Sequence, residues 1–278
     1  MTTTSTMIEG GGGLNAILFT KLHLLQRPLS PVMNNVYATL LTILYVKIVL
    51  EIGSYVRSRY DVPELSRKFV HLAACSFVMF WPLFDPNHWG WRLNVTVPVV
   101  MSLRLLYKGA ILKDPEDEDV RSLSRTSSPT ELLFGPLQMT LIMCHVGLNR
   151  YMTQTGIIVM SSLVGDGIAA IMGIEYGRHV YRAPLSGIGP GRKSIEGSIG
   201  CAFGTAGGML LFSYVTGIEI SRMGGEVEST NYHRTMMPMA IVYGIISAVV
   251  EATALRNYDN LILAFAMEMS VKRCNAGR

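Results

Sequence analysis

The stretch Ile157-Ile-Val-Met-Ser-Ser-Leu-Val-Gly-Asp-Gly-Ile-Ala-Ala-Ile-Met-Gly173 is an apolar run with a single carboxylate, Asp166, near its middle. An ionisable side chain inside a membrane-type segment is costly, and it therefore indicates a functional position by default. The flanking Gly165 and Gly167 weaken a helix, but they allow a backbone or a ligand to come close. We predict that Asp166 binds a metal or a substrate. The alternative is a carboxylate that is hydrogen-bonded to neighbouring helices.

The composition of the whole chain is that of a membrane protein. Hydrophobic residues make up 49% and charged residues 16% of the 278 positions, whereas soluble domains carry about 25% charged residues. A helix needs about 20 mostly apolar residues to cross a bilayer. The candidate spans are Val32–Ile52, Phe69–Phe84, Leu93–Leu112, Leu132–Leu148, Thr155–Tyr176, Gly197–Ile220, Met236–Leu255 and the shorter Asn260–Val271. We therefore predict an all-α, multi-pass transmembrane helical bundle with about seven to eight spans.

The chain divides into a tail and one polytopic membrane domain. Residues 1–31 begin with a Thr-, Ser- and Gly-rich segment and are predicted to be a disordered or interfacial N-terminal tail. Their start shows no convincing signal peptide and is compatible with a transit peptide. Residues 32–278 are predicted to form the membrane domain. The net charge is only +4 and the basic residues are scattered in short loops, so no nucleic-acid partner is expected.

The polar motifs of the loops share one side of the predicted membrane. Lys and Arg are more frequent in the loops after the first, third, fifth and seventh spans, which the positive-inside rule places on the cytosolic or stromal side. The same loops hold the polar clusters at 64–71, 124–133, 191–198 and 256–260. A structural protein does not require this arrangement, whereas an active site at the membrane interface does.

A glycine-rich basic loop, Gly189–Ser198, precedes an apolar segment. It lacks the spacing of a P-loop, but Gly191, Arg192, Lys193 and Ser194 offer a guanidinium, an ammonium, a hydroxyl and flexible backbone amides. The helix that follows is expected to begin at about residue 196, and the free N–H groups of a helix N-terminus attract phosphate. We predict phosphate binding here. The alternative is a basic loop that only sets membrane topology.

Other charged positions have two interpretations each. Lys68 and His71 share one helical face where a span begins, and they are either functional or a snorkelling cation beside a packed histidine. Glu131 precedes a span and can simply favour the helix dipole. Glu251 and Asp259 lie at depths where acids are as costly as Asp166. The acidic run 114–119 is predicted to be a solvated loop, because consecutive carboxylates repel and rarely converge on one ion.

Taken together, these segments resemble the polyprenol kinase family, which includes phytol kinase, farnesol kinase and, more distantly, dolichol kinase. The motifs that carry the resemblance are Glu64-Leu-Ser-Arg-Lys-Phe-Val-His71, Ser124-Arg125 with Glu131-Leu-Leu-Phe-Gly-Pro136, Gly165-Asp-Gly-Ile-Ala169 with Gly173 and Gly177, Lys193-Ser-Ile-Glu-Gly-Ser198, Glu251, and Asp259-Asn260-Leu261. The resemblance implies a multi-pass enzyme that phosphorylates an isoprenoid alcohol, typically with CTP and a divalent cation such as Mg²⁺. Where the family usually has a second acid after Gly-Asp-Gly-x-Ala, this chain has Ala170.

The resemblance also implies roles for individual residues. The metal would be held by Asp166, assisted by Asp259 or Glu131. The catalytic residues would be Asp166, His71 and Glu251, with the acceptor of the proton left open. The nucleotide-binding residues would be Gly191, Arg192, Lys193, Ser194, Gly197 and Ser198, with Arg67, Lys68 and Arg125 lining the same mouth.

Two alternatives remain open at this point. The first is a lipid cytidylyltransferase, which would use the same metal and triphosphate groups. The second is a small transporter in which Asp166 and Glu251 carry protons or ions. The expected partners are the lipid bilayer, an isoprenoid alcohol and a nucleotide. The sequence leaves open the oligomeric state, the choice among phytol, geranylgeraniol, farnesol and dolichol, and whether the membrane is the endoplasmic reticulum or the plastid.

Overall fold

The structure is a computed structural model that describes residues 30–60, 62–182, 192–218, 220, 232–255 and 257–276. Nearly all of the predicted N-terminal tail lies outside these ranges. Of the predicted nucleotide-binding residues, Gly191 also lies outside them, and only the backbone of Arg192 is described.

Nearly all of the secondary structure is helical. The elements in chain order are α2 (Pro31–Tyr60), α3 (Pro63–Cys75), η1 (Ser76–Leu83), η2 (Trp89–Val95), α4 (Thr96–Leu106), η3 (Tyr107–Leu112), α5 (Glu118–Leu123), η4 (Pro129–Leu133), α6 (Gly135–Asn149), α7 (Gln154–Tyr176), β1 (Val180–Arg182), β2 (Arg192–Ser194), α8 (Ile195–Thr216), α9 (Tyr232–Thr253) and α10 (Asp259–Ala276). Local signals fix several of the helix ends. Thr153 and Ser194 cap α7 and α8 with their side chains, and Gly217 ends α8 in the left-handed conformation.

Six helical segments of the described chain are long and apolar enough to cross a membrane: Pro31–Tyr60, Trp89–Leu112, Pro129–Asn149, Gln154–Tyr176, Ile195–Thr216 and Met236–Thr253. They match six of the predicted spans. The two remaining predictions, Phe69–Phe84 and Asn260–Val271, fall on α3 with η1 and on α10, which pack within the same bundle. The predicted class, a helical membrane bundle, is therefore confirmed.

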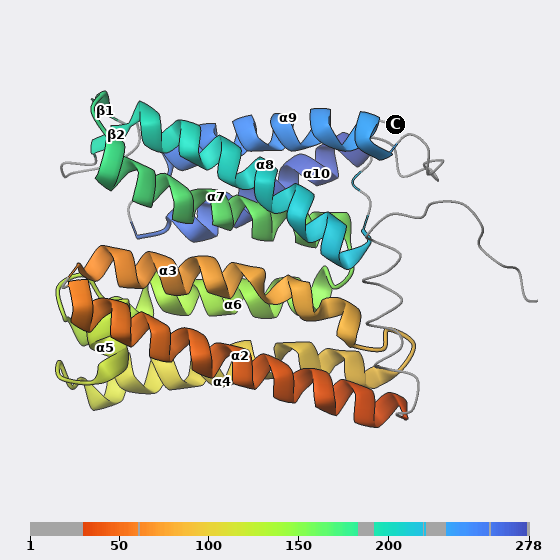
Figure 1. The fold of residues 1–278 in the computed structure, drawn as a ribbon, viewed down its shortest axis with the longest axis horizontal. Helices are drawn as coiled ribbons and strands as arrows, with labels where there is room; N and C mark the ends of the chain where they lie inside the picture. The colour runs from red at the N-terminus through yellow and green to blue at the C-terminus, as the bar shows by residue number, and fades with distance from the viewer. Residues whose placement is uncertain are drawn as a thin grey trace, which may run out of the picture.

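The helices form two groups whose axes run along the longest dimension of the molecule (Figure 1). One group contains α7, α8, α9 and α10, and the other contains α2, α3, α4 and α6. Helix α7 connects the groups, because it packs on α8 and α10 within its own group and on α3 of the other. Its first half, from Ile157 to Leu163, is buried at every position. This central place explains why most of α7 is apolar on all sides and why Asp166 is enclosed by protein.

The acidic run 114–119 differs from its prediction. Asp119 is buried, and its carboxylate pairs with Arg104 and with Lys108, whose Nζ lies 2.7 Å from Oδ2. Asp117 caps α5 by accepting a hydrogen bond from the Asp119 N–H. The prediction of a solvated loop is therefore wrong for Asp119. The two basic residues at the end of the span are paired with the Asp119 carboxylate, which the short helix α5 places on the inside of the bundle.

Candidate active site

The predicted functional residues gather at one end of the bundle. Helices α3, α8 and α10 begin at this end, α7 and α9 finish there, and the antiparallel hairpin β1–β2 covers it (Figure 1). In the hairpin, Tyr181 pairs with Lys193 and Val180 pairs with Ser194. Residues far apart in the sequence therefore meet because several helix ends converge.

A cavity of about 600 Å³ lies at this end and is called the charged cavity below. Its volume falls within the range of about 300–1,000 Å³ that is usual for small-molecule sites. The lining residues are Glu64, Arg67, Lys68, Arg125, Asp166, Ala169, Ala170, Gly173, Ile174, Gly177, Val180, Lys193, Ser194, Gly197, Ser198, Glu251, Ala254 and Asp259. Four of them are basic and four are acidic, so the cavity is highly charged but balanced.

Asp166 is held between two closely packed helices. A Cβ at Gly165 would clash with Thr205 of α8 and would lie 2.6 Å from the main-chain oxygen of Cys201. A Cβ at Gly167 would lie 2.5 Å from Cδ2 of Leu72 on α3. The two glycines therefore allow α8 and α3 to approach α7 directly. Of the two uses predicted for them, the structure shows the approach of neighbouring helices.

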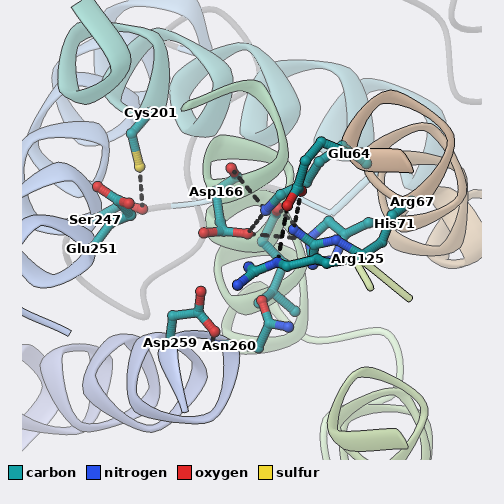
Figure 2. Close-up of polar contacts among 12 residues, drawn as sticks. Glu64, Arg67, His71, Arg125, Asp166, Cys201, Ser247, Glu251, Asp259 and Asn260 are labelled. Carbon is teal, nitrogen blue, oxygen red and sulfur yellow. Dashed lines mark hydrogen bonds and ion pairs between the residues drawn. The ribbon is translucent and has the colours of Figure 1, made fainter. Parts of the chain in front are cut away.

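Asp166 forms a buried cluster with Lys68 and His71. Lys68 Nζ lies 2.7 Å from Asp166 Oδ2, and His71 Nε2 lies 3.7 Å from the same oxygen. His71 Nε2 also donates a hydrogen bond of 2.9 Å to the main-chain oxygen of Leu163. Figure 2 shows the second carboxylate oxygen of Asp166 pointing away from this pair. Lys68 is only 4% exposed, so it is a buried counterion and not a snorkelling cation.

A second network joins Glu64 to two arginines. Arg67 Nη2 lies 2.8 Å from Glu64 Oε2, and Arg125 Nε lies 3.0 Å from Oε1. Partial burial acts to raise the pKa of Glu64, but Arg67 and then Arg125 together hold it below its ordinary value. Sequence reasoning placed Glu64 in a motif without giving it a role. The Glu64–Arg67 spacing of three residues was the available signal.

The basic loop supplies Lys193, which pairs with Glu251 of α9. Its Nζ donates to the Glu251 carboxylate and, at 3.0 Å, to the Glu251 main-chain oxygen. Burial acts to lower the pKa of Lys193, but Glu251 and then Asp166 and Asp259 together raise it above its ordinary value. Lys193 is therefore a charged ammonium at neutral pH, held where β2 enters α8.

The start of α8 forms one wall of the charged cavity. Ser194 Oγ accepts a hydrogen bond of 3.0 Å from the Gly197 N–H, as a helix cap does. Ser198 Oγ lies 2.6 Å from the Tyr181 hydroxyl of β1. The prediction that this loop and helix start would meet Asp166 in one site is consistent with the lining residues. The structure adds that Ser194 and one of the N–H groups are already engaged in capping.

Of the two residues predicted to assist Asp166, both line one neighbouring cavity, but only Asp259 also lines the charged cavity. Asp259 begins α10 and lines the charged cavity. Glu131 lines a neighbouring cavity of about 290 Å³, where its carboxylate accepts hydrogen bonds from the N–H groups of Arg125 and Thr126 and from the Thr126 hydroxyl. These contacts fix the loop that aims Arg125 at Glu64. Glu131 therefore lies beside the charged cavity, in a space that it shares with Arg67, Arg125 and Asp259, and its predicted metal role stays a prediction.

The oxygen atoms in the charged cavity fit a hard cation that keeps other ligands. Within the described ranges, no group of three or more His, Cys, Asp or Glu side chains is placed to hold a metal alone. Mg²⁺ bound to a nucleotide usually takes only one or two protein carboxylates, together with phosphates and water. Asp166 and Asp259 provide that number.

The fold and this cavity define the class of the protein. It is a polytopic α-helical membrane protein with a charged, small-molecule-sized cavity where several helix ends meet. No family model and no solved structure matches the chain significantly.

Curated relatives do match. A probable phytol kinase 1, chloroplastic, from Glycine max is 35% identical over 157 residues, 55% of this chain and 47% of the relative. Phytol kinase 1, chloroplastic, from Arabidopsis thaliana is 29% identical over 225 residues, 79% of this chain and 69% of the relative. A probable phytol kinase, chloroplastic, from Zea mays is 38% identical over 117 residues, 41% of this chain and 38% of the relative.

The match thus spans about half the length of the Glycine max relative and about two thirds of the Arabidopsis thaliana relative. These similarities confirm the predicted resemblance. They support the assignment of this chain to the polyprenol kinase family, in which its curated relatives are phytol kinases.

Proposed function

We propose that this chain is a membrane kinase that transfers the terminal phosphoryl group of CTP to the hydroxyl of an isoprenoid alcohol, with phytol as the first candidate. The observation that carries the proposal is the charged cavity, which brings Asp166, Lys68 and Lys193 together at one end of a membrane bundle. The names of the relatives support an alcohol of the phytol type.

Phosphoryl transfer depends mainly on positioning and on neutralising charge. The cavity offers four cations for a triphosphate: Arg67, Lys68, Arg125 and Lys193. Each pairs with an acid in the structure, so each is held in place before a nucleotide arrives. The N-terminus of α8 adds the N–H groups that capping leaves free. We assign nucleotide binding to these groups, while Gly191 and Arg192 remain predicted members of the site.

The metal proposal follows from the oxygen atoms of the cavity. Asp166 and Asp259 would hold Mg²⁺, and the ion would supply charge neutralisation for the phosphates. Glu131 is omitted because its carboxylate is committed to residues 125 and 126.

The hydrogen bonds around His71 favour this residue as the acceptor of the hydroxyl proton. Its Nε2 donates to the Leu163 carbonyl, which in the neutral ring leaves Nδ1 as the basic nitrogen. Asp166 and Glu251, the other two candidates, are each engaged by a lysine. We therefore assign the proton to His71 Nδ1.

We place the protein in a plastid membrane, because the names of the relatives are chloroplastic and six helices are suited to crossing a bilayer. Nothing found supports the endoplasmic reticulum. The charged cavity lies where helix ends converge, whereas transporter sites lie near the midplane between repeats, so the kinase is preferred over a transporter.

The test uses membranes that contain the chain, a panel of isoprenoid alcohols, and CTP labelled at either the γ- or the α-phosphate. The expected product carries γ-label only and is absent with Asp166→Asn. The matched control is Asp114→Asn, an exposed acid outside the charged cavity, which should retain activity. Entry of α-label into lipid would instead identify a cytidylyltransferase. Solute flux without lipid phosphorylation would favour a transporter.

A further inference from the structure

A second cavity lies among α2, α3, α4 and α6 and is used by none of the steps above. It has a volume of about 90 Å³ and is called the apolar cavity here. Most of its lining is hydrocarbon, including Val49, Phe77, Leu105, Met139 and Met143. We propose that the apolar cavity holds the first part of the isoprenoid chain, with the hydroxyl at its polar end beside Asp166. This inference rests on the proposed kinase function and assigns the site of its acceptor.

The polar end of the apolar cavity has two unsatisfied atoms. Asn260 Oδ1 and Arg67 Nε are buried and have no hydrogen-bond partner in the part of the chain that the structure describes. Both residues line the apolar cavity. Buried polar atoms in folded proteins are normally paired. One of these atoms accepts a hydrogen bond and the other donates one, and an alcohol hydroxyl does both. A hydroxyl within hydrogen-bond distance of either atom would supply its missing partner.

The polar end of the apolar cavity adjoins the groups that are proposed to take part in phosphoryl transfer. His71 lines the apolar cavity, and its Nε2 lies 3.7 Å from Asp166, which lines the charged cavity. Arg67 lines both cavities, and Asp259, the neighbour of Asn260, lines the charged one. Figure 2 shows His71, Asp166, Asp259 and Asn260 within one close-up. A hydroxyl at the polar end would therefore lie beside the His71 ring, whose other side faces Asp166 of the charged cavity.

The volume indicates how much of the chain is enclosed. A cavity of about 90 Å³ has room for roughly three water- or methylene-sized groups, at about 30 Å³ for each. That corresponds to less than one isoprene unit of about five carbons. A longer alcohol must therefore continue outside the apolar cavity.

A groove between α2 and α4 provides that continuation. Its volume is about 400 Å³, and it shares Val46, Leu50, Val97 and Met101 with the apolar cavity. The neighbouring residues Leu44 and Leu103 are 54% and 62% exposed, as expected for positions that face lipid. The lining of the groove is mixed, because it adds the charged residues Lys47, Glu51, Arg104, Glu118 and Asp119 to these apolar ones. The proposed route for the chain follows the apolar residues that the groove shares with the apolar cavity.

The test separates binding from catalysis. The full chain in lipid nanodiscs is exposed to a C20 isoprenoid alcohol with a photoactivatable diazirine on its second isoprene unit, and the labelled peptides are sequenced. We expect label on α2 and α4 around Val46 and Met101. Met101→Trp should reduce this labelling about tenfold by filling the passage. The matched control Leu103→Trp lies on the same helix but faces outward, and it should leave labelling unchanged.

A second pair of variants, on α2, controls for the effects of misfolding. Val46→Trp lines the passage and Leu44→Trp does not. If both passage variants keep wild-type melting temperatures, they should raise KM for the C20 alcohol more than for a C5 alcohol. Equal labelling in all variants, or label confined to the outer faces of α8 and α9, would overturn the inference. Labelling at Met101 without phosphoryl transfer from any nucleotide would support the binding site and contradict the kinase.

Discussion

The charged cavity and the apolar cavity lie on either side of one turn of α3. Lys68 lines the first and His71, three residues later, lines the second. In the charged cavity the basic groups already have acidic partners, whereas at the polar end of the apolar cavity Asn260 Oδ1 and Arg67 Nε have none among the described residues. In the charged cavity, a bound triphosphate would replace the acidic partners of the basic groups. In the apolar cavity, a bound hydroxyl would provide a hydrogen-bond partner that is now missing.

The largest effect is expected from removing the buried pair between Lys68 and Asp166. Asp166→Asn should destabilise the protein by about 3–5 kcal/mol, because it leaves the Lys68 charge buried without its counterion. Phosphoryl transfer should fall by at least about a hundredfold. Melting in detergent and transfer of γ-label measure the two effects.

The double variant Lys68→Met with Asp166→Leu separates the two roles of this pair. It should recover much of the lost stability, because it removes both charges together. It should not recover activity. If it did, Asp166 would have only a structural role and the proposed metal site would fail.

A smaller effect is expected from the helix packing that holds Asp166. Gly165→Ala should cost about 1–3 kcal/mol, because its methyl group would meet Thr205 and the Cys201 backbone. Gly207→Ala on α8 is the matched control. Nothing lies within 4 Å of a Cβ there, so this variant should not be destabilised and should gain up to about 1 kcal/mol from the better helix propensity of Ala. Equal melting temperatures for the two variants would contradict the close packing of α7 on α8.

Variants of two neighbouring residues at the start of α10 test separately the ligands proposed for the two cavities. Asn260→Leu removes the unpaired acceptor, so it should raise KM for the alcohol about tenfold and leave KM for the nucleotide unchanged. Asp259→Asn should instead raise the Mg²⁺ concentration needed for half-maximal rate about tenfold. Initial-rate kinetics in each substrate and in Mg²⁺ test both. If the two variants shifted the same constant, the two cavities would not have separate ligands.

The smallest effect concerns Ala170, which lines the charged cavity one turn beyond Asp166. Ala170→Asp introduces an acid at the position where the resemblance to the polyprenol kinase family leads us to expect one. We expect it to lower the Mg²⁺ concentration for half-maximal rate about threefold, because another carboxylate becomes available to the ion. Ala252→Asp, on α9 and outside both cavities, is the control. An unchanged Mg²⁺ dependence would place the ion away from this side of α7.

The class of the fold and the importance of Asp166 could both be predicted from the amino-acid sequence. Apolar runs of bilayer length predict helices through composition alone, and six of them are found. The cost of a carboxylate among apolar neighbours is also a local property, so Asp166 stood out without any partner being known. Lys68, Lys193 and Asp259 were predicted as members of its site, and all three line the charged cavity.

Which of these groups lie close together depends on the tertiary structure. Lys68 and Asp166 are 98 residues apart, and their pairing depends on how α3 packs against α7. Glu131 carries the same local signal as Asp259, yet its loop turns it toward Thr126, and Asp119 is drawn inward by two basic residues. No sequence pattern indicated the apolar cavity, because its lining residues come from several helices whose sequences are those of ordinary membrane spans. Helix formation is encoded over neighbouring residues, whereas cavities and buried charge pairs arise from the packing of distant ones.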